Sequence, residues 1–230
     1  MQHVEAGVAE LRTPVVILGA GGYASVIAEI LSKRADVLLL GATDKALGLS
    51  ERAHDDQPRL RILGDDDQLP VLAEEHAGLH AILALGMDLM DVRARLIQSL
   101  QRQGIPSINA IHPNAIVSED TQLGAGTVVR AAAVLSSESQ IGRHCVLELA
   151  CSLDHHVTLG TNVYIGQGAH VASYVEIRDN VVLEMGAQIN RRVVVGQGAR
   201  ITGGSFVNTD VPDYAVVVGV PGRVVRYVET

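Results

Sequence analysis

Residues 141–166 read IGRHCVLELACSLDHHVTLGTNVYIG, and an aliphatic residue returns at every sixth position of this stretch. A small or β-branched residue follows each one four positions later. A period of six fits neither a helix nor a plain strand, and it is typical of a parallel β-helix, in which short strands meet at tight corners and coils stack. The aliphatic series runs without a miss through Ile111, Val117, Leu123, Val129, Leu135, Ile141, Leu147, Leu153, Leu159, Ile165, Val171, Ile177, Leu183, Ile189, Val195, Ile201 and Val207.

The two cysteines of the chain fall within this repeat. Three six-residue units would close one triangular coil of about 18 residues, with the aliphatic side chains inside a narrow column. Cys145 and Cys151 both occupy the small inward position, in successive units. The repeat therefore predicts that they lie on different faces of the prism and form no disulfide bond.

Composition excludes several classes of protein. Hydrophobic residues make up 47% of the 230 residues and aromatic residues only 3%, which disfavours base-stacking nucleic-acid modules. The net charge of −8 disfavours non-specific nucleic-acid binding, and the high hydrophobicity excludes disorder. The first residues, MQHVEAGVAELRT, lack the pattern of a signal peptide, and no stretch approaches the roughly 20 apolar residues of a membrane span. We expect a cytoplasmic chain with reduced cysteines and no membrane partner.

The first hundred residues follow a different pattern, in which short apolar runs alternate with amphipathic segments. Such alternation predicts an α/β domain with a parallel sheet. We expect this domain over residues 1–108 and the β-helix with a C-terminal tail over residues 109–230. The predicted strands are 15–18, 36–41, 60–63, 79–85 and 105–108, and the predicted helices are 25–33, 65–76 and 88–103.

A glycine-rich turn joins the first predicted strand to the first predicted helix. Gly19, Gly21 and Ala24 fit the G-x-G-x-x-G/A fingerprint of phosphate binding at a helix N-terminus, and Asp44 follows where a ribose-binding acid would lie. A full dinucleotide site needs two βαβαβ halves, and this segment supplies one. A mononucleotide or a nucleoside diphosphate fits better; a tight turn without a ligand is the alternative.

A half-Rossmann domain followed by hexapeptide repeats resembles the sialic-acid O-acetyltransferase-like group of hexapeptide-repeat sugar acyltransferases. This group includes N-acetyltransferases for nucleotide-linked 4-amino-4,6-dideoxy sugars, such as those of bacillosamine and perosamine biosynthesis. The resemblance implies a left-handed β-helix and a homotrimer with active sites at subunit interfaces, acting in bacterial surface glycan or glycoprotein sugar synthesis. The matching segments are residues 19–23 (GAGGY), 41–44 (GATD), 83–86 (LALG), 111–113 (IHP), 153–160 (LDHHVTLG) and 218–221 (VGVP).

The resemblance also implies the catalytic residue. Acyl transfer to an amine needs a base, and the histidines of the repeat that could serve are His144, His155, His156 and His170. The family's base matches His155. The family usually has Asp or Glu directly after the base, where this chain has His156. Either Asp154 or another acid orients His155, or the base works without an anionic partner, or His156 shares the proton transfer.

Ligand contacts follow from the same resemblance. The implied donor is acetyl-CoA, with no metal, and the acceptor is a nucleotide-linked amino sugar. Family contacts to coenzyme A match Tyr164, Met185 and Gly203, and we expect the backbone N–H of Ser173, one coil after His155, to donate to the thioester oxygen. Arg191, Arg192 and Arg200 either meet the coenzyme's phosphates or are solvated surface charges. Contacts to the nucleotide sugar match Gly21, Gly22, Tyr23, Asp44, Lys45 and Gly86.

Two alternatives stay open at this point, and a third does not fit the histidine spacing. One is an O-acetyltransferase for a sialic-acid-like sugar, and another is a non-catalytic nucleotide-sugar-binding scaffold. A zinc enzyme of the γ-carbonic anhydrase kind needs three histidines that include a pair five residues apart, and the histidines of this repeat do not have that spacing. The identities of the nucleotide (UDP, GDP or dTDP), the sugar and the acyl group are not predicted.

Overall fold

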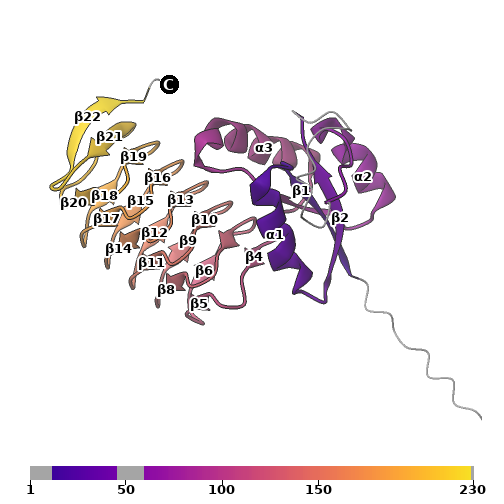
Figure 1. The fold of residues 1–230 in the computed structure, drawn as a ribbon, viewed down its shortest axis with the longest axis horizontal. Helices are drawn as coiled ribbons and strands as arrows, with labels where there is room; N and C mark the ends of the chain where they lie inside the picture. The colour runs from indigo at the N-terminus through magenta and orange to yellow at the C-terminus, as the bar shows by residue number, and fades with distance from the viewer. Residues whose placement is uncertain (1–11, 46–59, 229–230) are drawn as a thin grey trace, which may run out of the picture.

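The computed structural model describes residues 12–45 and 60–228. Its N-terminal part is a parallel three-stranded sheet in the order β2-β1-β3. Helices and short 3₁₀ turns connect and cover these strands (Figure 1). The elements are β1 (Thr13–Leu18), α1 (Gly22–Ser32), β2 (Val37–Thr43), η1 (Asp66–Gln68), α2 (Leu69–Glu75), β3 (His80–Leu83), η2 (Met87–Leu89) and α3 (Met90–Gln103).

Two of the predicted strands in this part were wrong. Residues 60–63 contribute one bridge, between Ile62 and Ala42, and the chain then turns at Gly64, whose φ is +119°. Residues 105–108 contribute one bridge, between Ser107 and Ala81. Pro106 lies within this second segment and has no N–H to donate to a ladder, so pairing stays short.

The second part is a parallel β-helix whose three faces are continuous ladders. Each aliphatic residue of the sequence repeat is the second residue of a two-residue strand, so the predicted fold is confirmed strand by strand. Face 1 holds β4 (Ala110–Ile111), β7 (Val128–Val129), β10 (Val146–Leu147), β13 (Tyr164–Ile165), β16 (Val182–Leu183), β19 (Arg200–Ile201), β21 (Ala215–Val218) and the antiparallel β22 (Arg223–Tyr227). Face 2 holds β5 (Ile116–Val117), β8 (Val134–Leu135), β11 (Ser152–Leu153), β14 (His170–Val171), β17 (Gln188–Ile189) and β20 (Phe206–Val207). Face 3 holds β6 (Gln122–Leu123), β9 (Gln140–Ile141), β12 (Thr158–Leu159), β15 (Glu176–Ile177) and β18 (Val194–Val195).

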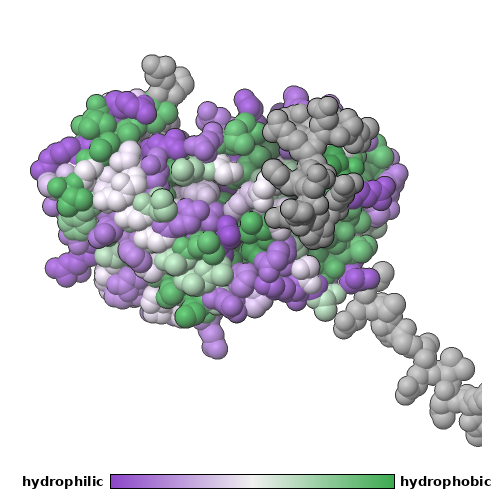
Figure 2. Space-filling view, viewed as in Figure 1, coloured by the Kyte–Doolittle hydropathy of each residue, from purple (hydrophilic) through white to green (hydrophobic). Residues whose placement is uncertain are grey.

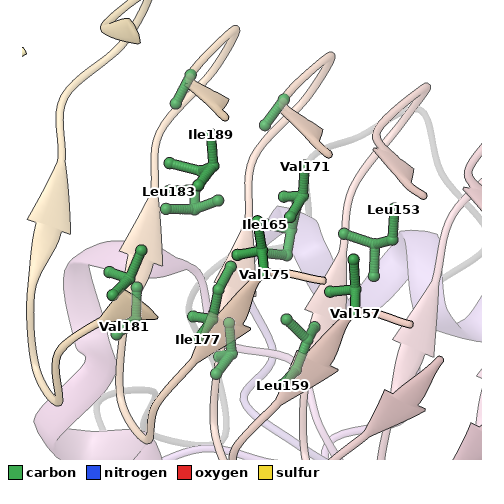
Figure 3. Close-up of a cluster of buried hydrophobic side chains, with 14 of the residues drawn as sticks. Leu153, Val157, Leu159, Ile165, Val171, Val175, Ile177, Val181, Leu183 and Ile189 are labelled. Carbon is green, nitrogen blue, oxygen red and sulfur yellow. The ribbon is translucent and has the colours of Figure 1, made fainter. Parts of the chain in front are cut away.

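The core of the β-helix is a column of stacked aliphatic side chains. Leu153, Leu159 and Ile165 are among those that point inward from successive strands in Figure 3. Cys145 and Cys151 lie in the same column, buried and unbonded, in the turns before face 1 and face 2. Burial raises the pKa of both thiols to about 12, so both are protonated at neutral pH.

The two parts of the chain share a second core on face 1. Outward side chains of this face, such as Val128 and Val146, belong to the same buried cluster as Ile27 and Ile30 of α1. Figure 1 shows α1 beside β4, the first strand of this face. A buried arginine of α3, Arg93, adds hydrogen bonds across the same boundary, to the backbone oxygen of His144 at 2.6 Å and to Asn162 Oδ1 at 2.8 Å. This packing fixes the α/β domain against one face of the prism.

The buried His144 predicts a dependence of stability on pH. Burial, followed by the charges of Arg93 and Arg143, lowers its pKa from 6.5 to about 4. The unfolded chain therefore binds a proton that the folded chain does not, and stability falls by about 3 kcal/mol as the pH drops from about 6.5 to 4. Urea unfolding across this pH range measures the loss. His144→Asn, which also tolerates the local φ of 57°, is expected to flatten the profile; an unchanged slope would refute the assignment.

Apolar side chains are exposed at the C-terminal end of the β-helix. Val218, Val220, Val225 and Tyr227 are exposed around β21 and β22, and Figure 2 shows apolar side chains gathered there. Within residues 12–45 and 60–228, no helix is long and apolar enough to cross a membrane.

Candidate active site

One edge of the prism carries the predicted catalytic histidines. It lies between face 2 and face 3 and consists of five two-residue turns, at residues 119–120, 137–138, 155–156, 173–174 and 191–192. We call it the histidine edge. In a three-sided prism this edge is opposite face 1, the face that packs against the α/β domain.

His155 and His156 contact each other on this edge. Their Nδ1 atoms are 3.0 Å apart, and Nε2 of His156 is 3.2 Å from Oε2 of Glu138. The ring of Tyr174 packs against both histidine rings, at centroid distances of 5.1 and 4.7 Å. Sequence reasoning missed Glu138 and Tyr174, although each lies 18 residues, one coil, from His156.

Asp154 was considered as the acid that orients the His155 ring, but its carboxylate binds the backbone of that residue. Its Oδ1 accepts a hydrogen bond of 2.8 Å from the backbone N–H of His155. This bond shapes the turn that presents the imidazole. The carboxylate that contacts a ring nitrogen of the pair is that of Glu138, from the preceding coil.

The glycine-rich loop lies at the carboxyl ends of β1 and β2. Gly19 has a φ of +98° and lies so close to Ala84 and Leu85 that a side chain would not fit. Gly21 is the N-cap of α1, and side chains at Gly21 or Gly22 would meet open space. The backbone N–H of Ala20 donates to Oδ2 of Asp44 at 2.8 Å. The structure thus brings Asp44 to the loop, where a helix N-terminus favours an anion such as a phosphate.

Of the other residues matched to the nucleotide sugar, two follow the strands next to this loop and one points into the domain boundary. Lys45 follows Asp44 and is exposed, and Gly86 begins η2 after β3, with open space where a side chain would be. Tyr23 instead points back into the domain boundary, where its ring lies 5.6 Å from the guanidinium of Arg130. Burial and the carboxylate of Glu148 raise the pKa of Tyr23.

Tyr164, matched to coenzyme A, lies in that boundary too. It is 6% exposed on face 1, and its hydroxyl donates to Oε1 of Glu148 at 2.9 Å. The other carboxylate oxygen of Glu148 pairs with Arg130 at 2.9 Å. In one subunit this tyrosine is therefore part of a buried cluster beneath the glycine-rich loop, and its contact with the coenzyme stays a prediction.

The other residues matched to coenzyme A lie at the two edges of face 2. Ser173 belongs to the histidine edge, next to Tyr174. Met185, which is 66% exposed, and Gly203 lie on the edge between face 1 and face 2, in successive coils. Arg191 and Arg192 belong to the histidine edge, whereas Arg200 pairs with Glu184 at 2.8 Å on face 1. Among the described residues, no group of three His, Cys, Asp or Glu side chains could hold a metal ion.

The fold is that of the hexapeptide-repeat acyltransferases, as the comparisons with known proteins show. Residues 14–100 match the model of the PglD N-terminal domain. PerB from Caulobacter crescentus, solved with CoA and GDP-perosamine, is 29% identical over 92% of this chain and 96% of that one, with a TM-score of 0.82. The acetyltransferase domain of PglB from Neisseria gonorrhoeae, solved with acetyl coenzyme A, is 25% identical over 93% of this chain and 100% of that one, with a TM-score of 0.81. The resemblance to the sugar acyltransferases is thereby confirmed.

Curated relatives match a much shorter segment. Serine acetyltransferases from Bacillus pumilus and Bacillus subtilis are 61% and 58% identical over 33 residues. That segment is 15% of the length of each enzyme and 14% of this chain. So short a match carries no information about the acceptor.

Proposed function

We propose that this protein is an acetyl-CoA-dependent N-acetyltransferase that acts on the amino group of a nucleotide-linked amino-deoxy sugar, with 4-amino-4,6-dideoxy sugars as the first class to test. The observation that carries the proposal is the combination, in one chain, of the histidine pair on an exposed prism edge and a glycine-rich helix N-terminus. The structural neighbour solved with CoA and GDP-perosamine has the same two-part fold. Because acetyl-CoA and nucleotide sugars are cytoplasmic metabolites, the cytoplasm is the proposed location.

The proposed reaction is a direct transfer. The sugar amine attacks the thioester carbonyl, the N–C bond forms and the C–S bond breaks. His155 accepts the proton that the amine loses, and the coenzyme leaves as the thiol after taking up that proton. Nδ1 of His155 is engaged with His156, so Nε2 is the atom that accepts the proton. Ser173 N–H is the proposed donor to the developing oxyanion.

The acceptor half of the site comes from a second subunit in this proposal. The glycine-rich loop belongs to the domain on face 1, and His155 lies on the opposite edge, so one chain separates the two halves. Ile116 and Val134 on face 2 are exposed apolar side chains that a neighbouring copy would cover. We propose a cyclic homotrimer, in which each site combines residues of two subunits.

The acceptor is tested by thiol release from acetyl-CoA with UDP-, GDP- and dTDP-linked amino sugars. The proposal predicts rapid, acceptor-dependent release with at least one 4-amino sugar nucleotide. The matched control is the same sugar nucleotide with a hydroxyl in place of the amine, which is expected to give no release. Release with only the hydroxyl sugar would favour an O-acetyltransferase, and binding without release would favour a non-catalytic scaffold.

A further inference from the structure

The histidine edge carries a ladder of reactive side chains. The second turn residues of successive coils are Asp120, Glu138, His156, Tyr174 and Arg192. The last four share a left-handed backbone conformation, with φ between 56° and 61°. Equal backbone geometry at equal spacing places these four side chains one above the other. Contact between adjacent coils therefore depends on residues that are 18 positions apart in the sequence.

Hydrogen-bond chemistry indicates which nitrogen carries the proton in each of the two contacts at the centre of this ladder. Glu138 Oε2 lies 3.2 Å from His156 Nε2, and because a carboxylate only accepts hydrogen bonds, this contact favours a proton on that nitrogen. A neutral His156 then has a bare Nδ1, which can only accept. The contact of 3.0 Å between the two Nδ1 atoms therefore requires the proton on Nδ1 of His155.

We propose that Glu138 is a positioning residue that acts through His156 to hold His155 in the tautomer with a bare Nε2. This inference rests on the proposed function, in which Nε2 accepts the proton from the amine. The chain Glu138–His156–His155 replaces the acid that the family usually has directly after its base. When His155 gains the proton at Nε2, no other bond has to break, and the new positive charge is stabilised along the chain by the carboxylate of Glu138.

The other charged groups around the pair have hydrogen bonds or ring contacts of their own, and Asp120 also interacts electrostatically with His156. Hydrogen bonds from the Ser118 side chain and the Glu138 backbone are the main causes that hold the pKa of Asp120 below its usual value. Asp154 accepts from the His155 backbone at 2.8 Å. The guanidinium of Arg192 lies 5.2 Å from the ring centre of Tyr174, and Tyr174 in turn packs on the histidine rings. Among the described residues, Glu138 is the carboxylate within ion-pair distance of a ring of the pair, that of His156.

The kinetic test compares Glu138→Gln with Glu119→Gln, an exposed acid on the same edge one coil further away. Glutamine keeps the acceptor oxygen and removes the charge. We expect kcat/KM to fall about fivefold near neutral pH, since the Glu138 side chain is 64% exposed and its charge is screened. The dependence of kcat/KM on pH is measured for each variant, and that of Glu138→Gln is expected to differ from the wild type, because the charge beside the ring pair is gone. Glu119→Gln should follow the wild-type profile.

A second substitution separates this role from a general loss of structure. His156→Asp places an acid directly after the base, so Glu138 has no ring left to orient. We expect Glu138→Gln to have no further effect in that background, which a double-mutant cycle measures as coupling. A Glu138→Gln profile that superimposes on the wild type, or an equal loss in both backgrounds, would overturn the proposal.

Nitrogen NMR of the histidine side chains gives a readout that needs no turnover. In the wild type, His155 should be protonated at Nδ1 and His156 at Nε2. In Glu138→Leu, which removes both charge and acceptor, both rings should become tautomer mixtures. A His155 that is protonated at Nε2 in the wild type, or that is unchanged in Glu138→Leu, contradicts the proposal. If no amino sugar is acetylated, the proposed function fails while this measurement still decides the tautomer.

Discussion

Replacing His155 by Ala is expected to lower kcat by a factor of about 10² to 10⁴, because a positioned general base contributes a rate enhancement of that order. The side chain projects from a turn on the histidine edge, outside the aliphatic column, so the fold should be retained. Steady-state thiol release with the best acceptor measures kcat, and circular dichroism checks the fold.

His170→Ala is the matched control for this substitution. His170 is exposed on face 2 of the same β-helix and its ring contacts Ser152 Oγ at 2.7 Å. This variant should retain wild-type kcat. Equal losses in the two variants, or an active His155→Ala enzyme, would show that His155 is not the base.

Replacing Arg93 by Met is expected to lower the free energy of unfolding by about 3 kcal/mol or more, since hydrogen bonds to a charged group contribute about 1.5 to 3 kcal/mol each. The guanidinium is 1% exposed and also donates to the backbone oxygen of Leu85 at 2.9 Å. Methionine fills the same space but leaves Asn162 Oδ1 and the backbone oxygen of His144 without this donor. Urea unfolding, with a transition for each part of the chain if they separate, measures the change.

Arg95→Met provides the comparison for Arg93. Arg95 lies in the same helix α3 and is exposed, so its replacement should change stability by less than about 0.5 kcal/mol. Similar urea midpoints for the two variants would mean that the hydrogen bonds of Arg93 across the domain boundary contribute little.

The fold of the β-helix could be predicted from the sequence because its determinants are local. Each unit of six residues carries its own inward-pointing aliphatic side chain, as Ile141 and Leu147 do, so the pattern can be recognised without knowledge of the rest of the chain. The α/β part was predicted less completely. Short apolar runs such as residues 60–63 have the composition of strands. Whether such a run pairs with its neighbour over one residue or over four depends on the path of the surrounding chain, which the residues of the run do not determine.

Residues that act across distance in the sequence were harder to predict. Arg93 occupies an amphipathic helix, where an arginine normally faces water, and its partners at His144 and Asn162 lie far along the chain. Glu138 could not be predicted from the sequence neighbours of His155, because it lies one coil away from His156. The 18-residue coil, already predicted, was the signal that could have found it.

Acetyl transfer to a sugar nitrogen at the histidine edge is the reaction proposed for this protein. Mass spectrometry of the product formed with acetyl-CoA and a nucleotide-linked 4-amino sugar is the decisive measurement. We expect one added acetyl group that survives mild base, as an amide does and an ester does not, and no such product with His155→Ala. A base-labile product, or an unmodified sugar nucleotide after incubation with every acceptor, would contradict it.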